Sequence, residues 1–391
     1  MDDLPTEIKL VIAQHVAHMD PETNHMRIPQ LPLSPRKATG LKYGTLKSLS
    51  SLNKQWRVIA KPHLFSHLVL YMGEGVSGNY STSTRFRLAI NDAAESLTQL
   101  PHRSENQSEG PIRIDSLAIE IDELLVSNSQ ALRNPARHST DIITMFGFWR
   151  RIFEAVDPTR LAIVAPVSIL GYLITTIPNM SDEWAFKDMS TQMLELSQSP
   201  DRPYLKKAPE NPKNAAWDTE YLFNARPWKE LQLMEGSMLQ AYGIYEYFHR
   251  QPPTILQGLI LPRSEHLESM RLHCLFPFSS HVDELHVLSL THYKHLHFHF
   301  SPCPNMSVLD DSSVVGKADM ADCWREMEQI YQMLCRHLLS AGEVANLVEF
   351  STGDYAVESI RRILEEGFLA VAAQGWSATG DGKWRRPSKS P

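Results

Sequence analysis

Apolar residues recur at helical spacing in two stretches near the N-terminus of the chain. The first stretch, which includes Ile8, Ile12 and Val16, predicts a helix that begins close to Pro5, a residue that the first helical turn tolerates. The second stretch covers residues 46–60, and Pro62 is expected to end it because the residue before a proline is disfavoured in a helix. The prolines between the two stretches exclude one continuous helix.

The rest of the chain alternates between strand-like and helix-like patterns, which predicts an α/β protein. Short alternating runs indicate strands, and longer runs with apolar residues three or four apart indicate helices. On one such helix Trp324, Met327 and Tyr331 share a face, which predicts a core contact. Strands are expected at residues 67–71, 112–121, 160–164, 229–233, 256–261, 267–272, 285–290 and 295–300. Helices are expected at 85–100, 141–156, 182–196, 319–340 and 355–374, and loops at 101–111, 197–227 and 303–316.

Residues 161–181 carry no charge and approach the roughly 20 residues that a membrane-spanning helix needs. Pro166 and Gly171 interrupt this segment, and Pro178 precedes its polar end. We therefore expect a buried strand over residues 161–164, a turn at Pro166 and a short buried helix. This interpretation predicts no membrane association.

Composition narrows the class of protein. The net charge of −7 and the isoelectric point of about 6.2 lack the basic excess typical of nucleic-acid-binding domains. The N-terminal residues lack the long apolar run of a secretory signal. The sequence thus predicts an intracellular protein, cytoplasmic or nuclear, with no nucleic-acid partner. Four isolated cysteines indicate neither a zinc ribbon nor a disulfide framework: Cys274, Cys303, Cys323 and Cys335.

The two N-terminal stretches carry motifs in a fixed order. The first opens with Leu4-Pro5-Thr6-Glu7-Ile8, and in the second three leucines precede Asn53-Lys54-Gln55-Trp56-Arg57. This order resembles the F-box, whose first helix opens with Leu-Pro-x-Glu and whose leucine-rich second helix precedes a third helix that carries Trp and Arg. The chain departs from the family where residues 20–45 replace a short connection. Long surface insertions cost little closure entropy, so the bundle remains feasible.

The resemblance implies a docking function. F-box modules bind the Skp-type adaptor of SCF ubiquitin ligases, which are built on a cullin scaffold, and the remainder of the chain recruits a protein substrate. A three-helix unit has much surface for its volume, so apolar residues that it cannot bury are available to a partner. The alternative role for the same residues is an ordinary internal core. The candidate adaptor contacts, by position in the motif, are Leu4, Pro5, Ile8, Ile12, Leu46, Leu49 and Leu52.

Leucine-rich strand segments beyond residue 229 resemble the irregular leucine-rich repeats that often follow an F-box. In such a solenoid the strands line a concave face that contacts the partner. The expected organisation is an F-box-like module at 1–66, a linker and helix at 67–111, an irregular leucine-rich-like α/β domain at 112–316, C-terminal helices at 317–374 and a mobile tail at 375–391.

Histidines are densest at His295, His297 and His299. On a strand these three side chains share one face, and Leu296 and Phe298 point to the other. They are candidate substrate-facing residues, and their charge would respond to pH near neutrality. The alternative is a metal site, because imidazole binds zinc and copper. Same-side residues of one strand lie roughly 6–7 Å apart, so three on one metal would strain the strand.

The sequence gives little indication of nucleotide binding or of nucleophilic catalysis. Residues 73–78 match G-x-G-x-x-G, but a polar segment follows and no acidic residue ends a second strand, so a loop is expected rather than a dinucleotide site. The sequence contains no phosphate-binding P-loop and no G-x-S-x-G nucleophile elbow. Lys383-Trp384-Arg385-Arg386, in the expected tail, could contact acidic partners.

Together these patterns predict a non-enzymatic protein that needs no cofactor or metal. The leading hypothesis is a substrate-recruiting subunit of an SCF-type ligase. The alternatives are an F-box scaffold without ubiquitin transfer and a metal-dependent enzyme built on the histidine strand.

Overall fold

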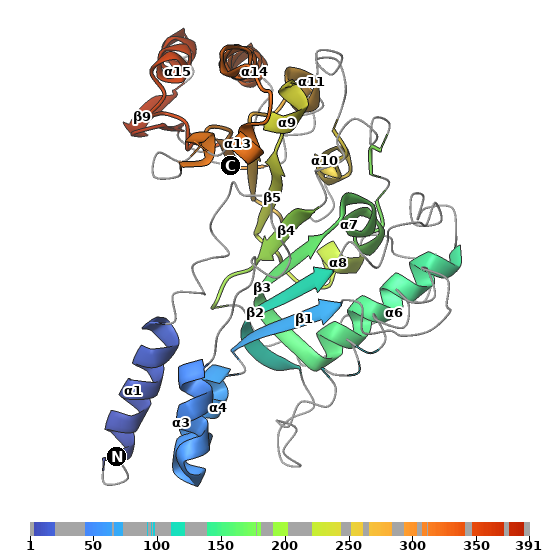
Figure 1. The fold of residues 1–391 in the computed structure, drawn as a ribbon, viewed down its shortest axis with the longest axis vertical. Coiled ribbons are helices and arrows are strands. Elements are labelled where there is room, and N and C mark those ends of the chain that lie inside the picture. Colours follow the sequence, from blue (N-terminus) through green and yellow to red (C-terminus); the bar gives the residue numbers. More distant parts are fainter. Residues whose placement is uncertain are drawn as a thin grey trace.

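The computed structural model describes a bundle of three helices followed by a sheet with helices along one side (Figure 1). The bundle lies next to the edge of the sheet that is formed by strand β1 (His67–Met72). The described residues are 4–19, 44–64, 66–72, 92, 95, 97, 111–121, 139–176, 178–180, 191–201, 221–243, 252–260, 266–283, 293–302, 307–310, 312–340, 346–370 and 375–386.

The N-terminal helices are α1 (Thr6–Met19), α3 (Gly44–Leu52) and α4 (Lys54–Leu64), which we call the helical module. Helix α1 begins directly after Pro5, as predicted. Asn53 separates α3 from α4, and its side-chain Oδ1 accepts a 2.9 Å hydrogen bond from the backbone N–H of Trp56, a typical helix N-cap. The Trp56 side chain is fully buried in the module.

The expected helix end at Pro62 is wrong. Helix α4 continues to Leu64, and the break in the leucine-rich stretch falls at Asn53 instead. Pro62 lies two residues from the end of α4, so its missing N–H removes one hydrogen bond from a final turn. The packing of the module stabilises the helical conformation of Lys61 by more than the following proline disfavours it.

The strands form one ten-stranded sheet in the order β1-β2-β3-β4-β5-β6-β7-β8-β10-β9. Strand order thus follows the chain except at the C-terminal end. Strands β1 to β3 and β5 to β8 pair in parallel within each set, and β4 and β10 run antiparallel to their neighbours. The strands are β1 (His67–Met72), β2 (Ile112–Ile121), β3 (Val156–Ala165), β4 (Gln192–Ser197), β5 (Glu230–Ser237), β6 (Ser269–Leu275), β7 (His295–His299), β8 (Glu349–Thr352), β9 (Ser377–Gly380) and β10 (Lys383–Arg385).

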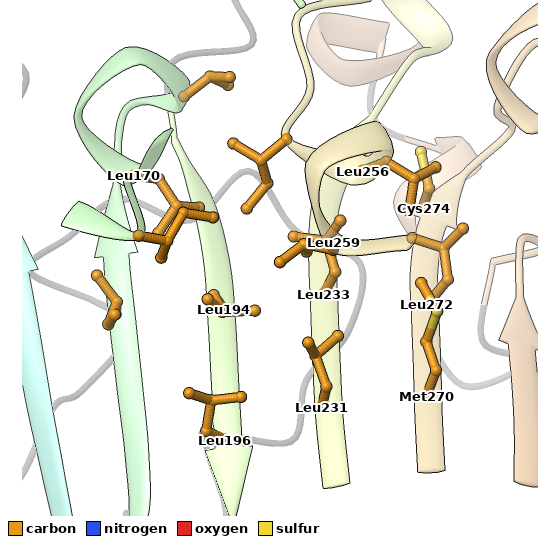
Figure 2. Close-up of a cluster of buried hydrophobic side chains, with 14 of the residues drawn as sticks. Leu170, Leu194, Leu196, Leu231, Leu233, Leu256, Leu259, Met270, Leu272 and Cys274 are labelled. Atoms are coloured by element: carbon orange, nitrogen blue, oxygen red, sulfur yellow. The ribbon is translucent and has the colours of Figure 1, made fainter. Parts of the chain in front are cut away.

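Helices cover one face of this sheet. Their apolar residues and those of the strands form one continuous buried cluster that extends from Met72 to Trp384. Figure 2 shows its centre, where leucines of β4, β5 and β6 meet Leu170 of α7 and Leu256 and Leu259 of α10. The predicted core face of Trp324, Met327 and Tyr331 belongs to this cluster. The helices are α6 (Ser139–Ala155), α7 (Val167–Leu173), α8 (Tyr221–Asn224), α9 (Leu239–Tyr242), α10 (Leu256–Ile260), α11 (Ser279–Asp283), α13 (Ser312–Val315), α14 (Met320–Ser340) and α15 (Glu358–Ala370), with the 3₁₀ turn η7 (Ser307–Asp310).

The uncharged segment after residue 160 folds as predicted. Residues 161–165 of strand β3 are buried, and Pro166 precedes helix α7. Five apolar side chains of α7 lie in the buried core: Val167, Ile169, Leu170, Tyr172 and Leu173. None of the described helices combines the length and the hydropathy that a membrane span requires.

Two predicted elements have the wrong type. Residues 182–190 of the expected helix over 182–196 lie outside the described residues, and its last part is strand β4, where Leu194 and Leu196 face the helices and Glu195 faces away. Pairing with both β3 and β5 outweighs the local helical preference. The expected strand at 256–261 is helix α10, because the Thr254 hydroxyl accepts a 2.9 Å bond from the Leu256 N–H and starts a helical turn after two prolines.

The expected domain boundaries also need correction. Strand β1 belongs to the main sheet, so residues 67–72 of the expected linker are part of the sheet. Helices α14 and α15 pack on the same core as the rest, and β8 lies between them in the chain. The expected mobile tail contains the β9–β10 hairpin, and Trp376 and Trp384 pack on Phe368 with ring centroids 5.3 and 4.5 Å away. Expected loops at 197–227 and 303–316 contain α8, η7 and α13.

Several expectations fall outside the described residues. These are the proline-rich insertion at about 20–45 apart from its last two residues, most of the expected helix at 85–100, the expected loop at 101–111 apart from its last residue, the glycine motif at 73–78 and the expected strand at 285–290.

Candidate protein-binding surfaces

The helical module exposes large apolar side chains on each of its three helices. Ile8 and Val11 on α1, Leu52 on α3 and Val58 on α4 are between 46% and 71% exposed. Isolated exposed apolar residues are common on protein surfaces, but here they recur on every helix of one small unit. We call these four residues the exposed apolar set.

The predicted adaptor contacts divide between surface and interior. Pro5, Ile8 and Leu52 are exposed, and Leu4 and Ile12 are partly exposed. The remaining two are not at a described surface: Leu49 is buried in the module, as the alternative of an internal core predicts, and the side chain of Leu46 in α3 lies outside the described part.

Polar contacts fix α1 against α4. The buried Lys9 ammonium donates a 2.7 Å bond to the Gln55 side-chain oxygen, and the Gln55 amide donates a 3.0 Å bond to the Thr6 hydroxyl. Because these bonds hold one face of α1 against α4, the face that carries Ile8 and Val11 is left outward.

The second candidate surface is the face of the sheet that the helices do not cover, which we call the polar face. Residues opposite one another in the strand register share a face. One row across the sheet consists of Glu195, Gln232, Arg271, His297, Ser351 and Lys383. A second, parallel row consists of Arg160, Ser197, Glu230, Ser269, His295, Glu349 and Arg385.

Opposite charges pair along the polar face. The Arg160 guanidinium makes a bidentate contact with Glu195, at 2.8 and 2.7 Å. Arg385 lies 2.5 Å from a carboxylate oxygen of Glu349, and Arg271 lies 3.8 Å from a carboxylate oxygen of Glu230. Among the described residues, Lys383 has no carboxylate within ion-pair distance.

The histidine strand lies as predicted. His295, His297 and His299 share the polar face of β7, and Leu296 and Phe298 point into the core. His273 of β6, which the sequence pattern did not single out, joins them, with its ring centroid 5.4 Å from that of His297 and 5.7 Å from that of His299.

Burial and like charges keep two of these histidines neutral. Burial, followed by the neighbouring His297 and His299, lowers the pKa of His273 well below its usual value. Burial, followed by Arg271, His299 and Lys383, lowers the pKa of His297 to about 4. The Nδ1 atom of His297 lies 2.9 Å from the Ser351 hydroxyl.

A metal site gains no support from this cluster. Within the described ranges, no group of three or more His, Cys, Asp or Glu side chains is arranged to hold a metal ion.

Other buried polar clusters are closed to solvent. Glu235 contacts His281 at 2.5 Å and accepts hydrogen bonds from Thr254 and Gln192, with the Glu235 and His281 side chains fully buried. Asp354 accepts bonds from the backbone N–H groups of Phe300 and Ser301 and from buried Tyr331. These clusters connect strand ends to neighbouring segments, and their burial suits a structural role.

No protein-family model matches this chain, and no curated protein or solved structure is significantly similar to it.

Proposed function

We propose that this protein is a substrate-recruiting subunit of an SCF-type ubiquitin ligase. The observation that carries the proposal is the exposed apolar set, on a three-helix module whose sequence resembles the F-box. Exposed apolar side chains become buried when a protein interface forms, and their burial provides most of the binding free energy. A Skp-type adaptor is the partner that the resemblance implies.

The sheet supports the second half of the proposal. Its strands follow one another across the sheet in chain order through β8, with helices on one face, and this order supports the proposed likeness to a leucine-rich solenoid. The antiparallel β4 and the C-terminal hairpin make the arrangement irregular. In this account the polar face contacts the substrate.

The chain would position a substrate rather than transform it. Holding the substrate close to a ubiquitin-loaded enzyme of the same complex accelerates transfer through proximity. This function needs no cofactor in the chain itself, and it places the protein in the cytoplasm or the nucleus, with a cullin as a further partner.

Capture by a purified Skp-type adaptor tests the proposal. The full chain should be retained by immobilised adaptor, and Ile8→Glu/Leu52→Glu should reduce retention at least tenfold because both charges would be buried in the interface. Leu369→Glu on α15 is the matched control, since Leu369 is 76% exposed and lies far along the chain from the module. Loss of retention in the control, or equal retention of all three proteins, would contradict the proposal.

Recovery of a cullin with the captured complex distinguishes the ligase from a scaffold. A ligase subunit should bring the cullin, and a client protein should accumulate when the gene is deleted. An adaptor complex without cullin would instead support the scaffold.

A further inference from the structure

The polar face carries a row of hydrogen-bond donors that includes two cations. No carboxylate of the described residues fully compensates their positive charge. Arg271, His297, Ser351 and Lys383 follow one another across β6, β7, β8 and β10. Neighbouring strands lie about 4.8 Å apart, so Arg271 and Lys383 are separated by about 14 Å. Both are exposed, whereas His297 and Ser351 between them are more deeply set.

The charge balance of this region favours an anionic partner. The neighbouring row contributes Glu230 and Glu349, of which Glu349 is paired with Arg385. Glu230 lies 3.8 Å from Arg271, which is longer than a charge-assisted hydrogen bond and leaves most of the guanidinium donors available. Lys383 adds a positive charge without a partner in the described residues, so three cations face two carboxylates.

The histidines beside the row add no charge at neutral pH. His297 is neutral because its pKa is lowered to about 4, and the Ser351 hydroxyl, 3.4 Å from the Leu296 carbonyl to which it donates, can accept from the Nδ1–H of His297. The two cations therefore act as separate anchors, with a neutral, polar floor between them.

We infer that this row binds an extended protein segment that carries two acidic side chains four residues apart. An extended chain advances about 3.4 Å per residue, so side chains at positions i and i+4 point the same way and lie about 13.6 Å apart. That spacing matches the separation of Arg271 and Lys383. The residue at i+2 faces His297, where the floor favours a small or polar side chain.

This inference deepens the proposed function, because it names the class of substrate segment that the polar face accepts. It rests on the proposed function for its biological meaning only, since the binding itself is measurable on the isolated chain.

Fluorescence anisotropy with labelled eleven-residue peptides tests the inference on the full chain. In a Gly/Ser background, a peptide with Glu at i and i+4 should bind about tenfold more tightly than its Gln/Gln counterpart. Peptides with Glu at i and i+2, or with a single Glu, should bind several-fold more weakly than the matched spacing. Raising the salt concentration to about 0.5 M should weaken the contact, because exposed charges are screened.

Charge-reversal variants test the inference more stringently. Arg271→Glu/Lys383→Glu should abolish binding of the Glu/Glu peptide and create binding of a Lys/Lys peptide with the same spacing. The matched control is Arg325→Glu, an exposed arginine on helix α14, which should leave both affinities unchanged. Equal affinity for Glu/Glu and Gln/Gln peptides, or no preference among spacings, would overturn the inference.

The adaptor capture described above separates the two claims. Retained capture together with failed peptide binding would refute only this inference. Peptide binding without adaptor capture would refute the proposed function and leave this site standing.

Discussion

The helical module and the sheet bury their apolar residues in different ways. The sheet places most of its apolar side chains in one continuous cluster beneath the helices, and its other face carries the polar rows together with two small buried apolar clusters. The module buries a small interior around Trp56 and leaves the exposed apolar set on its surface. A region with a large core is stable alone, whereas a small module with outward apolar residues gains stability when a partner covers them. Under the proposed function, this contrast makes the helical module the end of the chain that binds the adaptor.

The largest expected effect comes from breaking a buried ion pair in the sheet region. Arg226 lies 2.8 Å from Asp157, and both side chains are fully buried. Arg226→Met should lower the free energy of unfolding of the sheet region by about 3 kcal/mol, because the buried Asp157 carboxylate then keeps only the more distant, partly exposed Arg113, 3.9 Å away, as a cationic partner. Urea unfolding followed by tryptophan fluorescence measures this loss.

The double variant Asp157→Leu/Arg226→Met is the control, since replacing both partners removes the uncompensated charge. It should recover most of the lost stability. A double variant as unstable as Arg226→Met would show that the pair acts through something other than charge.

Trp56→Ala tests the independence of the module. Removing a fully buried tryptophan should cost about 3 kcal/mol, which is comparable with the whole stability expected of so small a unit. Backbone amides of α1 and α4 should then exchange with solvent as in an unfolded chain. Amides of β2 and β3 should keep their protection, and their loss in the same variant would show that the two regions fold as one.

Acid should weaken the sheet through its histidine cluster. A histidine whose pKa is lower in the folded state stabilises the fold fully above the unfolded pKa of about 6.5, and this stability is lost as the pH falls toward the folded value. For His297 that value is about 4, so about 2 kcal/mol should be lost between pH 7 and pH 4, after allowing for its partial exposure.

The variant His273→Leu/His297→Gln isolates this contribution from that of carboxylates. Its stability should fall less steeply than that of the natural chain over the same pH range. Parallel curves from thermal unfolding at each pH would exclude the cluster as the source.

The smallest expected effect concerns the exposed apolar set. Ile8→Ser/Leu52→Ser should change the free energy of unfolding of the module by less than about 0.5 kcal/mol, because these side chains contribute little to its interior. Hydrogen exchange at α1 and α4 measures the change. A loss above about 1 kcal/mol would mean that these residues belong to the core.

Local patterns in the sequence predicted the elements that obey simple periodicity. Strand β2, the helices α6 and α14 and the segment around Pro166 match their expected positions closely. The local patterns predict the wrong type for strand β4 and helix α10. The strand is determined by pairing with β3 and β5, and the helix by a capping hydroxyl after two prolines. Strand pairing and capping contacts of this kind cannot be predicted from a short window of sequence.

The candidate surfaces were predictable only in part. The Leu-Pro motif placed Leu4, Pro5 and Ile8 at a surface, but neighbouring Val11 has no motif to mark it. The histidine alternation correctly placed three side chains on one face, whereas His273 joins them only through the parallel register of β6 and β7. The sequence predicts a mobile tail at Lys383, whereas the structure has a strand there, because Trp384 packs in the core.

Hydrogen exchange of the full chain with and without purified Skp-type adaptor tests the central claim most directly. The account predicts that the adaptor slows exchange at least tenfold in α1, α3 and α4, and leaves β5 to β8 unchanged. Unchanged exchange in all three helices at saturating adaptor would contradict it.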